Sequence, residues 1–310
     1  FSFFPSNKTV YKNIYKLLPG YKIIIENNKI KKQKYWEQNI DQKKTFSYNK
    51  LTNLTEKNLK ESIYLNLRSD VKLGLLLSSG IDSSILGYLI SSKIQNLNTL
   101  SINYSGKQDN EADDARNFSS FINSNHHSYT IKANSFFRYF DEIFSKIDEP
   151  NGDTALISSY LLAKKAKKLN IKVLISGAGA DEIFGGYSRF FANFNNSLFG
   201  ALQQLQKFDF LNKVVPYKFR NLLYKLTNSK IALASNYSGQ NFGVLTDFIS
   251  DYKKEFLLSN LENIIIDYKN SFYGFDSKKV MLNDLNNYLP NNILSAFDKA
   301  TMLNSVEGRV

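Results

Sequence analysis

The chain has 310 residues, no cysteine, and 40 basic against 28 acidic residues, which gives a formal net charge of +12. Its length suffices for one large domain or two modest domains with a full core. Without cysteine, this sequence cannot form a disulfide, a thiolate metal site or a cysteine nucleophile. No purely apolar run reaches the roughly 18 residues that span a membrane, so we expect no membrane partner.

The positive charge raises the question of a nucleic-acid partner. Only six of the basic residues are arginines, however, and arginine is the side chain whose planar fork binds phosphate best. The lysines are spread through the chain among asparagine, isoleucine, tyrosine and phenylalanine. We therefore interpret the charge as a solvated surface and expect no nucleic-acid partner.

In chain order, residues 1–40 contain short β segments, and the stretch 21–26 alternates towards a turn at Asn27 and Asn28. Residues 55–68 are expected to form a helix, because Thr55 can cap it and apolar residues recur at helical spacing. From residue 73 strand and helix alternate. Strands are expected over 73–77, 98–104, 127–132 and 171–175, and helices over 83–94, 111–123, 135–146, 155–169 and onward from 181.

This alternation predicts an α/β fold with a mostly parallel sheet and helices on both faces. Beyond about residue 195 no strand pattern persists, and leucine, phenylalanine and tyrosine recur at helical intervals. We therefore expect three parts: residues 1–40, an α/β domain over 41–195, and a helical part over 196–310.

The most informative segment is the apolar run 73–77 followed by Ser78-Ser79-Gly80-Ile81-Asp82-Ser83-Ser84. The small residues let backbone N–H groups approach a polyanion at the start of a helix, and the hydroxyls of Ser83 and Ser84 add donors. Asp82 would repel a phosphate unless a divalent cation lay between them. The motif therefore predicts a nucleotide with Mg²⁺.

A second turn of small residues, Ser176-Gly177-Ala178-Gly179-Ala180, follows the apolar run 171–175. It is not a dinucleotide fingerprint, because Glu182 stands where that pattern needs its last glycine, and the chain contains no G-x-x-x-x-G-K-[ST] loop. Ligands of parallel sheets bind beyond the carboxyl ends of the strands. Both turns lie at such ends, so we expect them to converge on one nucleotide.

Residues 78–84 resemble the S-G-G-x-D-S loop of the N-type ATP pyrophosphatases (PP-loop enzymes), which split ATP into AMP and pyrophosphate. Residues 176–187 resemble the S-G-x-G-A-D-E-x-F-G-G-Y signature of asparagine synthetases. Further matches in the family's order are 99–104, Glu111 with Ala115, His126-His127, Asp148-Glu149-Pro150 with Asp153, Asp298-Lys299 and 306–310. The chain is thus similar to the synthetase domain of the glutamine-hydrolysing asparagine synthetases, with an adenine nucleotide alpha-hydrolase-like fold.

The resemblance implies ATP-dependent amide formation: a carboxylate, by analogy the aspartate side chain, is adenylated, and ammonia derived from glutamine then displaces AMP. It implies that Asp82 and Asp181 hold Mg²⁺, that Lys299 meets phosphate and that Asp153 contacts the amino acid. The nucleotide contacts that it implies are Leu77, Ser78, Ser79, Gly80, Asp82, Ser83, Ile102, Ser176 and Gly177. The competing interpretations are helix N-capping by Asp82 and Asp181, and ordinary sheet core for Leu77 and Ile102.

The resemblance also suggests that residues 1–40 are the tail and linker of a glutaminase domain, and that the sequence is a fragment. ATP chemistry favours the cytoplasm. The oligomeric state stays open, with a homodimer as one option. His126 and His127 lack the partners of a metal site, so we expect them to have a polar packing role.

Two positions depart from the family pattern. Ser79 replaces a glycine, which costs little if its φ is negative and much if its φ is positive. Ala178 stands where the family commonly has an acid, so either another group substitutes, or the substrate differs, or amide formation is slow. Ala178 makes a catalytically degenerate relative with a binding role one alternative. An RNA-modifying PP-loop enzyme, which shares the first loop, is the other.

Overall fold

A computed structural model describes residues 3–4, 7–38, 45–105, 111–132, 138–187, 190 and 281–310. The chain divides into two compact units. The sheet unit comprises Leu17–Pro150, Thr154–Ala180 and Ile293–Val310, and the second unit comprises Phe1–Lys16, Asn151–Asp153 and Asp181–Asn292. In the part of the chain that the structure describes, every helix is too short or too polar to span a membrane.

The first regular element is an antiparallel hairpin of β1 (Tyr21–Glu26) and β2 (Lys29–Lys34). Its turn consists of Asn27 and Asn28, with φ of 48° and 58°. Asparagine tolerates this left-handed conformation, and two such residues give the turn that suits the twist of a hairpin. The predicted strand and turn are confirmed.

The core of the sheet unit is a five-stranded sheet in the order β5-β4-β3-β6-β7, and every neighbouring pair is parallel. The strands are β3 (Leu73–Leu76), β4 (Asn98–Tyr104), β5 (Asn125–Ile131), β6 (Val173–Ile175) and β7 (Glu307–Arg309). The chain leaves the central strand β3 towards β4 on one side and returns to β6 on the other. Such a switch in strand order opens a crevice at the carboxyl edge of the sheet.

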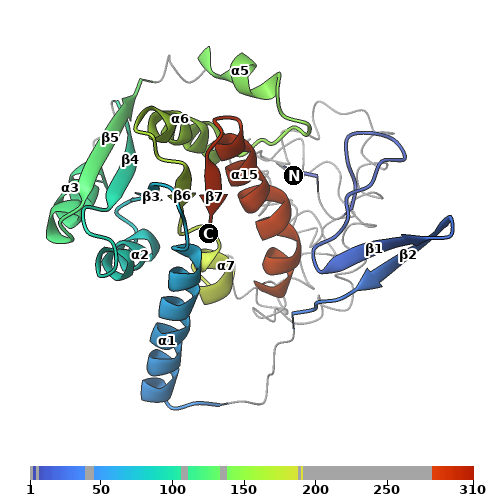
Figure 1. Ribbon diagram of the computed structural model, residues 1–310, viewed down its shortest axis with the longest axis horizontal. Helices are drawn as coiled ribbons and strands as arrows, with labels where there is room; N and C mark the ends of the chain where they lie inside the picture. The colour runs from blue at the N-terminus through green and yellow to red at the C-terminus, as the bar shows by residue number, and fades with distance from the viewer. Residues whose placement is uncertain are drawn as a thin grey trace, which may run out of the picture. The chain divides into compact units, whose positions relative to one another are not determined.

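Helices cover both faces of this sheet (Figure 1). The helices α1 (Tyr48–Asn66), α2 (Ile81–Ser91) and α3 (Glu111–Phe121) lie on one face, and α6 (Ala155–Lys168) and α15 (Ser295–Met302) lie on the other. Alternation along β3 explains this arrangement, because Leu75 packs with α2 while Leu76 packs with α6. The predicted α/β fold with a mostly parallel sheet is confirmed.

The shorter helices of the described residues are α5 (Phe140–Phe144), α7 (Ala180–Phe184) and a π-helix, η4 (Asp284–Leu294). The helix predicted over 135–146 is thus observed only as α5, and residues 133–137 lie outside the described residues. The helix predicted from residue 55 begins earlier, at Tyr48. Helix ends are set by capping and packing, which periodicity alone does not fix.

One strand was missed. Residues 307–309 were assigned to a helical part, whereas they form β7, which pairs with β6 in the sheet unit. The helical assignment of 196–310 is therefore wrong at its carboxyl end. A three-residue strand is too short to display the alternation that reveals a strand in a sequence. Residues 191–280 lie outside the described residues, and the domain boundaries near 40 and 195 stay a prediction.

Candidate functional site

A cavity of about 310 Å³ opens at the carboxyl edge of the sheet, where β3, β4 and β6 end. Its volume falls within the range of small-molecule sites. Its lining comes from these strand ends, from the turns after β3 and β6, and from α2, α3 and α6: Leu76, Leu77, Ser78, Ser79, Asp82, Ser83, Leu100, Ser101, Ile102, Tyr104, Glu111, Ala115, Leu162, Ser176 and Gly177.

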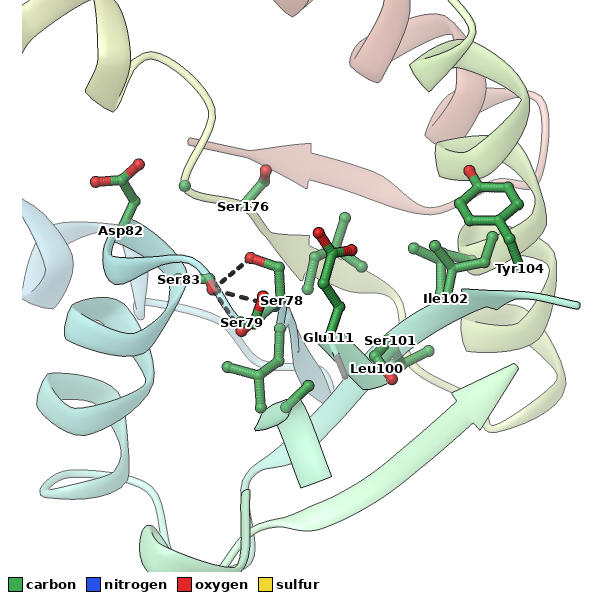
Figure 2. A pocket seen from close by; sticks show the side chains of 15 residues that line it. Ser78, Ser79, Asp82, Ser83, Leu100, Ser101, Ile102, Tyr104, Glu111 and Ser176 are labelled. Atoms are coloured by element: carbon green, nitrogen blue, oxygen red, sulfur yellow. Dashed lines mark hydrogen bonds between the residues drawn. The ribbon is translucent and has the colours of Figure 1, made fainter. Parts of the chain in front are cut away.

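The loop after β3 is held together by its own hydroxyl groups (Figure 2). Ser83 is buried, and its hydroxyl accepts a bond of 3.1 Å from the Ser78 N–H. The carbonyl oxygens of Ser78 and Gly80 each lie 3.1 Å away as alternative acceptors of its one proton. The Gly80 N–H donates to Ser78 Oγ at 3.1 Å. The hydroxyls of Ser78 and Ser83 are thus used within the loop and hold its shape.

Helix α2 starts directly after this loop, and Asp82 and Ser83 of its first turn line the cavity. Its N-cap residue is Gly80, and no side chain makes a capping hydrogen bond there. Asp82 lies in the first turn, so the interpretation of Asp82 as the N-cap of α2 is wrong. The backbone N–H groups at a helix start and the helix dipole favour a phosphate at such a position.

The serine that replaces a family glycine causes no backbone strain. Ser79 is not among the described residues with positive φ, and Gly80 has a φ of −73°. A side chain is therefore tolerated at position 79.

The loop after β6 lies against the first loop. A Cβ atom on Gly177 would lie 3.3 Å from the Asp82 Cβ and 3.5 Å from the Ser83 nitrogen, so only glycine allows this approach without a shift. Gly179 has a φ of 96°, a conformation that side chains disfavour. The Ala178 N–H donates to Ser176 Oγ at 3.2 Å. The two small-residue turns thus meet at one edge of the sheet, as the sequence predicted.

Asp82 lines the cavity, as Figure 2 shows, whereas Asp181 belongs to the second unit. Gly186 packs against Asp181, since a Cβ there would lie 2.8 Å from the Asp181 Cγ. No group of three or more histidine, aspartate or glutamate side chains with metal-binding geometry occurs among the described residues. The carboxylate of Asp82 is a ligand type that suits Mg²⁺, and phosphate oxygens would complete such a site. The pairing of Asp82 with Asp181 stays a prediction.

Glu182 is a structural acid next to Asp181. It is 1% exposed and accepts a hydrogen bond of 2.8 Å from the Tyr187 hydroxyl. Burial raises the pKa of Glu182, and the nearby charges of Asp181 and Asp284 raise this pKa further. The hydrogen bond from Tyr187 acts in the opposite direction and lowers it. Glu182 therefore anchors α7 within the second unit rather than presenting a charge to solvent.

Lys299 is not among the residues that line the cavity. Its Nζ lies 2.8 Å from Asp148 Oδ1 and 4.0 Å from Glu149 Oε2. The hydrogen bond from Lys299 holds the pKa of Asp148 below its usual value. The lysine is therefore paired with the acidic segment before Pro150, and its predicted contact with phosphate stays a prediction.

Asp153 is likewise not among the residues that line the cavity, and it belongs to the second unit. Its Oδ2 accepts a hydrogen bond of 3.0 Å from Asn292, and its N–H donates to the side chain of Asn151 at 2.7 Å. Asn151 and Asn292 are both buried and bond to each other at 3.1 Å. This buried amide cluster gives Asp153 a structural partner, and its contact with a substrate stays a prediction.

Sequence reasoning missed several residues of the wall. Glu111, at the start of α3, directs its carboxylate into the cavity (Figure 2). It was noticed only as part of the family match. Ser101 and Tyr104 could have been inferred, because they belong to the strand that carries Ile102. Leu162 comes from α6, and nothing local in the sequence marks it.

The two histidines are neighbours on β5 and bond to polar side chains of β4 on opposite faces of the sheet. His126 Nδ1 lies 2.9 Å from Thr99 Oγ1, and His126 Nε2 lies 3.1 Å from Ser101 Oγ. His127 Nε2 lies 3.3 Å from Asn98 Oδ1. The predicted polar packing role is confirmed, and His126 also touches a residue of the cavity wall.

The fold and the cavity define the class: an α/β protein with its site at the carboxyl edge of a parallel sheet. The family model "Asparagine synthase" matches residues 54–310. The chain belongs to the asparagine synthase family.

Curated relatives agree with this assignment. The chain is 33% identical over 210 residues to the "Putative asparagine synthetase [glutamine-hydrolyzing] 2" of Methanocaldococcus jannaschii, covering 66% of this chain and 40% of that protein. It is 27% identical to the "Asparagine synthetase [glutamine-hydrolyzing] 1" of Bacillus subtilis, covering 100% of this chain and 49% of that protein. The chain thus spans less than half the length of these two relatives.

Proposed function

We propose that this chain is the synthetase part of an enzyme that forms an amide from a carboxylate, ATP and ammonia released from glutamine. The carboxylate that the family favours is the side chain of aspartate. The observation that carries the proposal is the contact between the two small-residue loops, which brings Gly177 against Asp82 at the start of helix α2.

The first half-reaction is adenylation. A carboxylate oxygen attacks the α-phosphorus of ATP in line, the bond from that phosphorus to the pyrophosphate oxygen breaks, and negative charge grows on the pyrophosphate. The N–H groups at the start of α2 are placed to stabilise this charge. Bound Mg²⁺ would neutralise phosphate charge, and Asp82, with Asp181 as the predicted second ligand, would hold it.

The nucleoside would lie along the apolar strand ends. Leu77 and Ile102 line the cavity, together with Ser176 and Gly177 from the second loop. An apolar wall beside an anion-binding loop matches the two ends of a nucleotide. This arrangement supports the contacts predicted for these residues.

The second half-reaction needs a group that takes up a proton. Ammonia attacks the acyl carbon, the bond to the AMP oxygen breaks, and the new nitrogen must lose a proton. Ala178 cannot accept it. Glu111 carries a carboxylate on the cavity wall, so we assign it this role.

The test is formation of AMP and pyrophosphate by the full-length protein with ATP, Mg²⁺, aspartate and either ammonia or glutamine. We expect Asp82→Asn to lower AMP formation about 100-fold, because the metal and the phosphate charge lose a ligand. Asp113→Asn is the matched control, since Asp113 is an exposed acid on α3. If no carboxylate yields AMP, the proposal is wrong, and stimulation by tRNA alone would favour the RNA-modifying alternative.

A binding role without synthesis is the second candidate, because Ala178 lacks the acid that the family commonly carries. Ala178→Glu separates the two. A large gain in amide formation would favour the degenerate relative, whereas no gain would favour Glu111 as the substitute. A cytoplasmic location and a homodimer remain expectations of the family resemblance.

A further inference from the structure

A chain of hydrogen bonds links the wall of the cavity to helix α3. Ser101 Oγ lies 3.1 Å from His126 Nε2, and His126 Nδ1 lies 2.9 Å from Thr99 Oγ1. Thr99 Oγ1 lies 3.0 Å from Ser124 Oγ, which donates to the Ser119 carbonyl oxygen at 3.2 Å. Thr99 is fully buried and Ser101 is 4% exposed, so the hydroxyl protons of these two residues must be used within the protein.

The direction of the chain follows from giving each buried hydroxyl proton an acceptor. Ser124 gives its one hydroxyl proton to Ser119, so Thr99 must donate to Ser124. Thr99 then has only lone pairs for His126, so the ring carries its proton on Nδ1. A neutral ring has a bare Nε2, which accepts the proton of Ser101. In the reverse direction the Ser119 carbonyl oxygen would keep the Ser124 N–H at 2.9 Å, but the proton of the buried Ser101 hydroxyl would have no acceptor among the described residues.

The surroundings of His126 keep its ring neutral. Burial lowers the pKa of His126, and the charge of Arg116 and the neighbouring ring of His127 lower it further. The chain therefore persists at neutral pH, and the Ser101 oxygen is left with lone pairs only.

We propose that Ser101 is a specificity-determining residue that accepts a hydrogen bond from the amino group of a purine base, with His126 as its positioning residue. Ser101 lines the cavity between Leu100 and Ile102, the apolar end that suits a base (Figure 2). A serine hydroxyl whose proton is already used can only accept a hydrogen bond. It therefore favours a 6-amino purine, whose amino group donates, and disfavours a 6-oxo purine, whose oxygen would face the lone pairs of the serine oxygen. This inference rests on the proposed nucleotide site.

The binding test compares ATP with the triphosphate of purine riboside, which lacks the amino group, and with ITP. We expect the wild type to bind ATP about 3- to 10-fold more tightly than the purine riboside compound, the effect of one neutral hydrogen bond. Ser101→Ala should abolish that difference. Ser128→Ala, an exposed serine paired with Ser101 in the sheet register, should preserve it.

A second measurement reports the direction of the chain directly. The protein has two histidines, so ¹⁵N-histidine labelling gives two rings. We expect the proton of His126 on Nδ1. We expect that of His127 on Nε2, because His127 Nε2 lies 3.3 Å from the oxygen Asn98 Oδ1. His127→Gln assigns the signals, and a proton on Nε2 of His126 would overturn the inference.

The outcomes separate this inference from the proposed function. If the wild type binds no ATP, the proposed function itself fails. If it binds ATP but Ser101→Ala leaves the preference over the purine riboside compound unchanged, only the inference about Ser101 fails.

Discussion

Gly177→Ala tests the contact between the two loops. The new Cβ would lie 3.3 Å from the Asp82 Cβ and 3.5 Å from the Ser83 nitrogen, so the loops must separate by a few tenths of an ångström. A misplacement of about 1 Å in an active site costs about 100-fold in rate, so we expect kcat/KM for ATP to fall on the order of 10-fold.

Stability should respond differently from activity. Replacing a glycine whose φ is compatible with a side chain gains about 0.4–1 kcal/mol from the unfolded state, which offsets part of the crowding. We therefore expect the free energy of unfolding of Gly177→Ala to stay within about 1 kcal/mol of the wild type.

Gly179→Ala is the matched control in the same loop. Its φ of 96° strains any side chain, so this variant should lose stability by about 1 kcal/mol or more. The assays are AMP release at varied ATP and urea unfolding. Wild-type kcat/KM for Gly177→Ala would refute the argument that the loop contact positions the nucleotide.

Three further predictions follow from the described residues. Glu111→Gln should slow amide formation at least about 10-fold with a smaller effect on ATP binding, measured by single-turnover kinetics and calorimetry; equal loss in both would contradict a role in proton transfer. Ser79→Gly should change the free energy of unfolding by less than about 1 kcal/mol, because position 79 needs no positive φ; a large gain in urea unfolding would reveal hidden strain. Burial lowers the pKa of His126 in the folded chain, so the unfolded chain binds the extra proton first as pH falls below about 6.5. Stability should therefore fall from pH 7.5 to pH 5.5, and His126→Gln should reduce that slope; an unchanged slope would rule out His126 as a source.

The sequence by itself determined the local elements and their chemistry. Alternating strand and helix patterns predicted the parallel sheet. The small residues from Ser78 to Ser84, at the start of a helix, marked the loop after β3, because such a pattern can be recognised from neighbouring positions alone. The placement of Gly177 beside that loop also followed, since the carboxyl ends of parallel strands share one edge.

Only the tertiary structure decided which distant residues meet. Strand β7 is too short to reveal itself locally, and it exists because β6 offers it an edge. Lys299 pairs with Asp148 although they lie far apart in the chain, and Ser101 meets His126 because β4 and β5 pair in this register. Local periodicity reports which face of an element is buried, but the partner on that face is set by how the whole sheet and its helices pack.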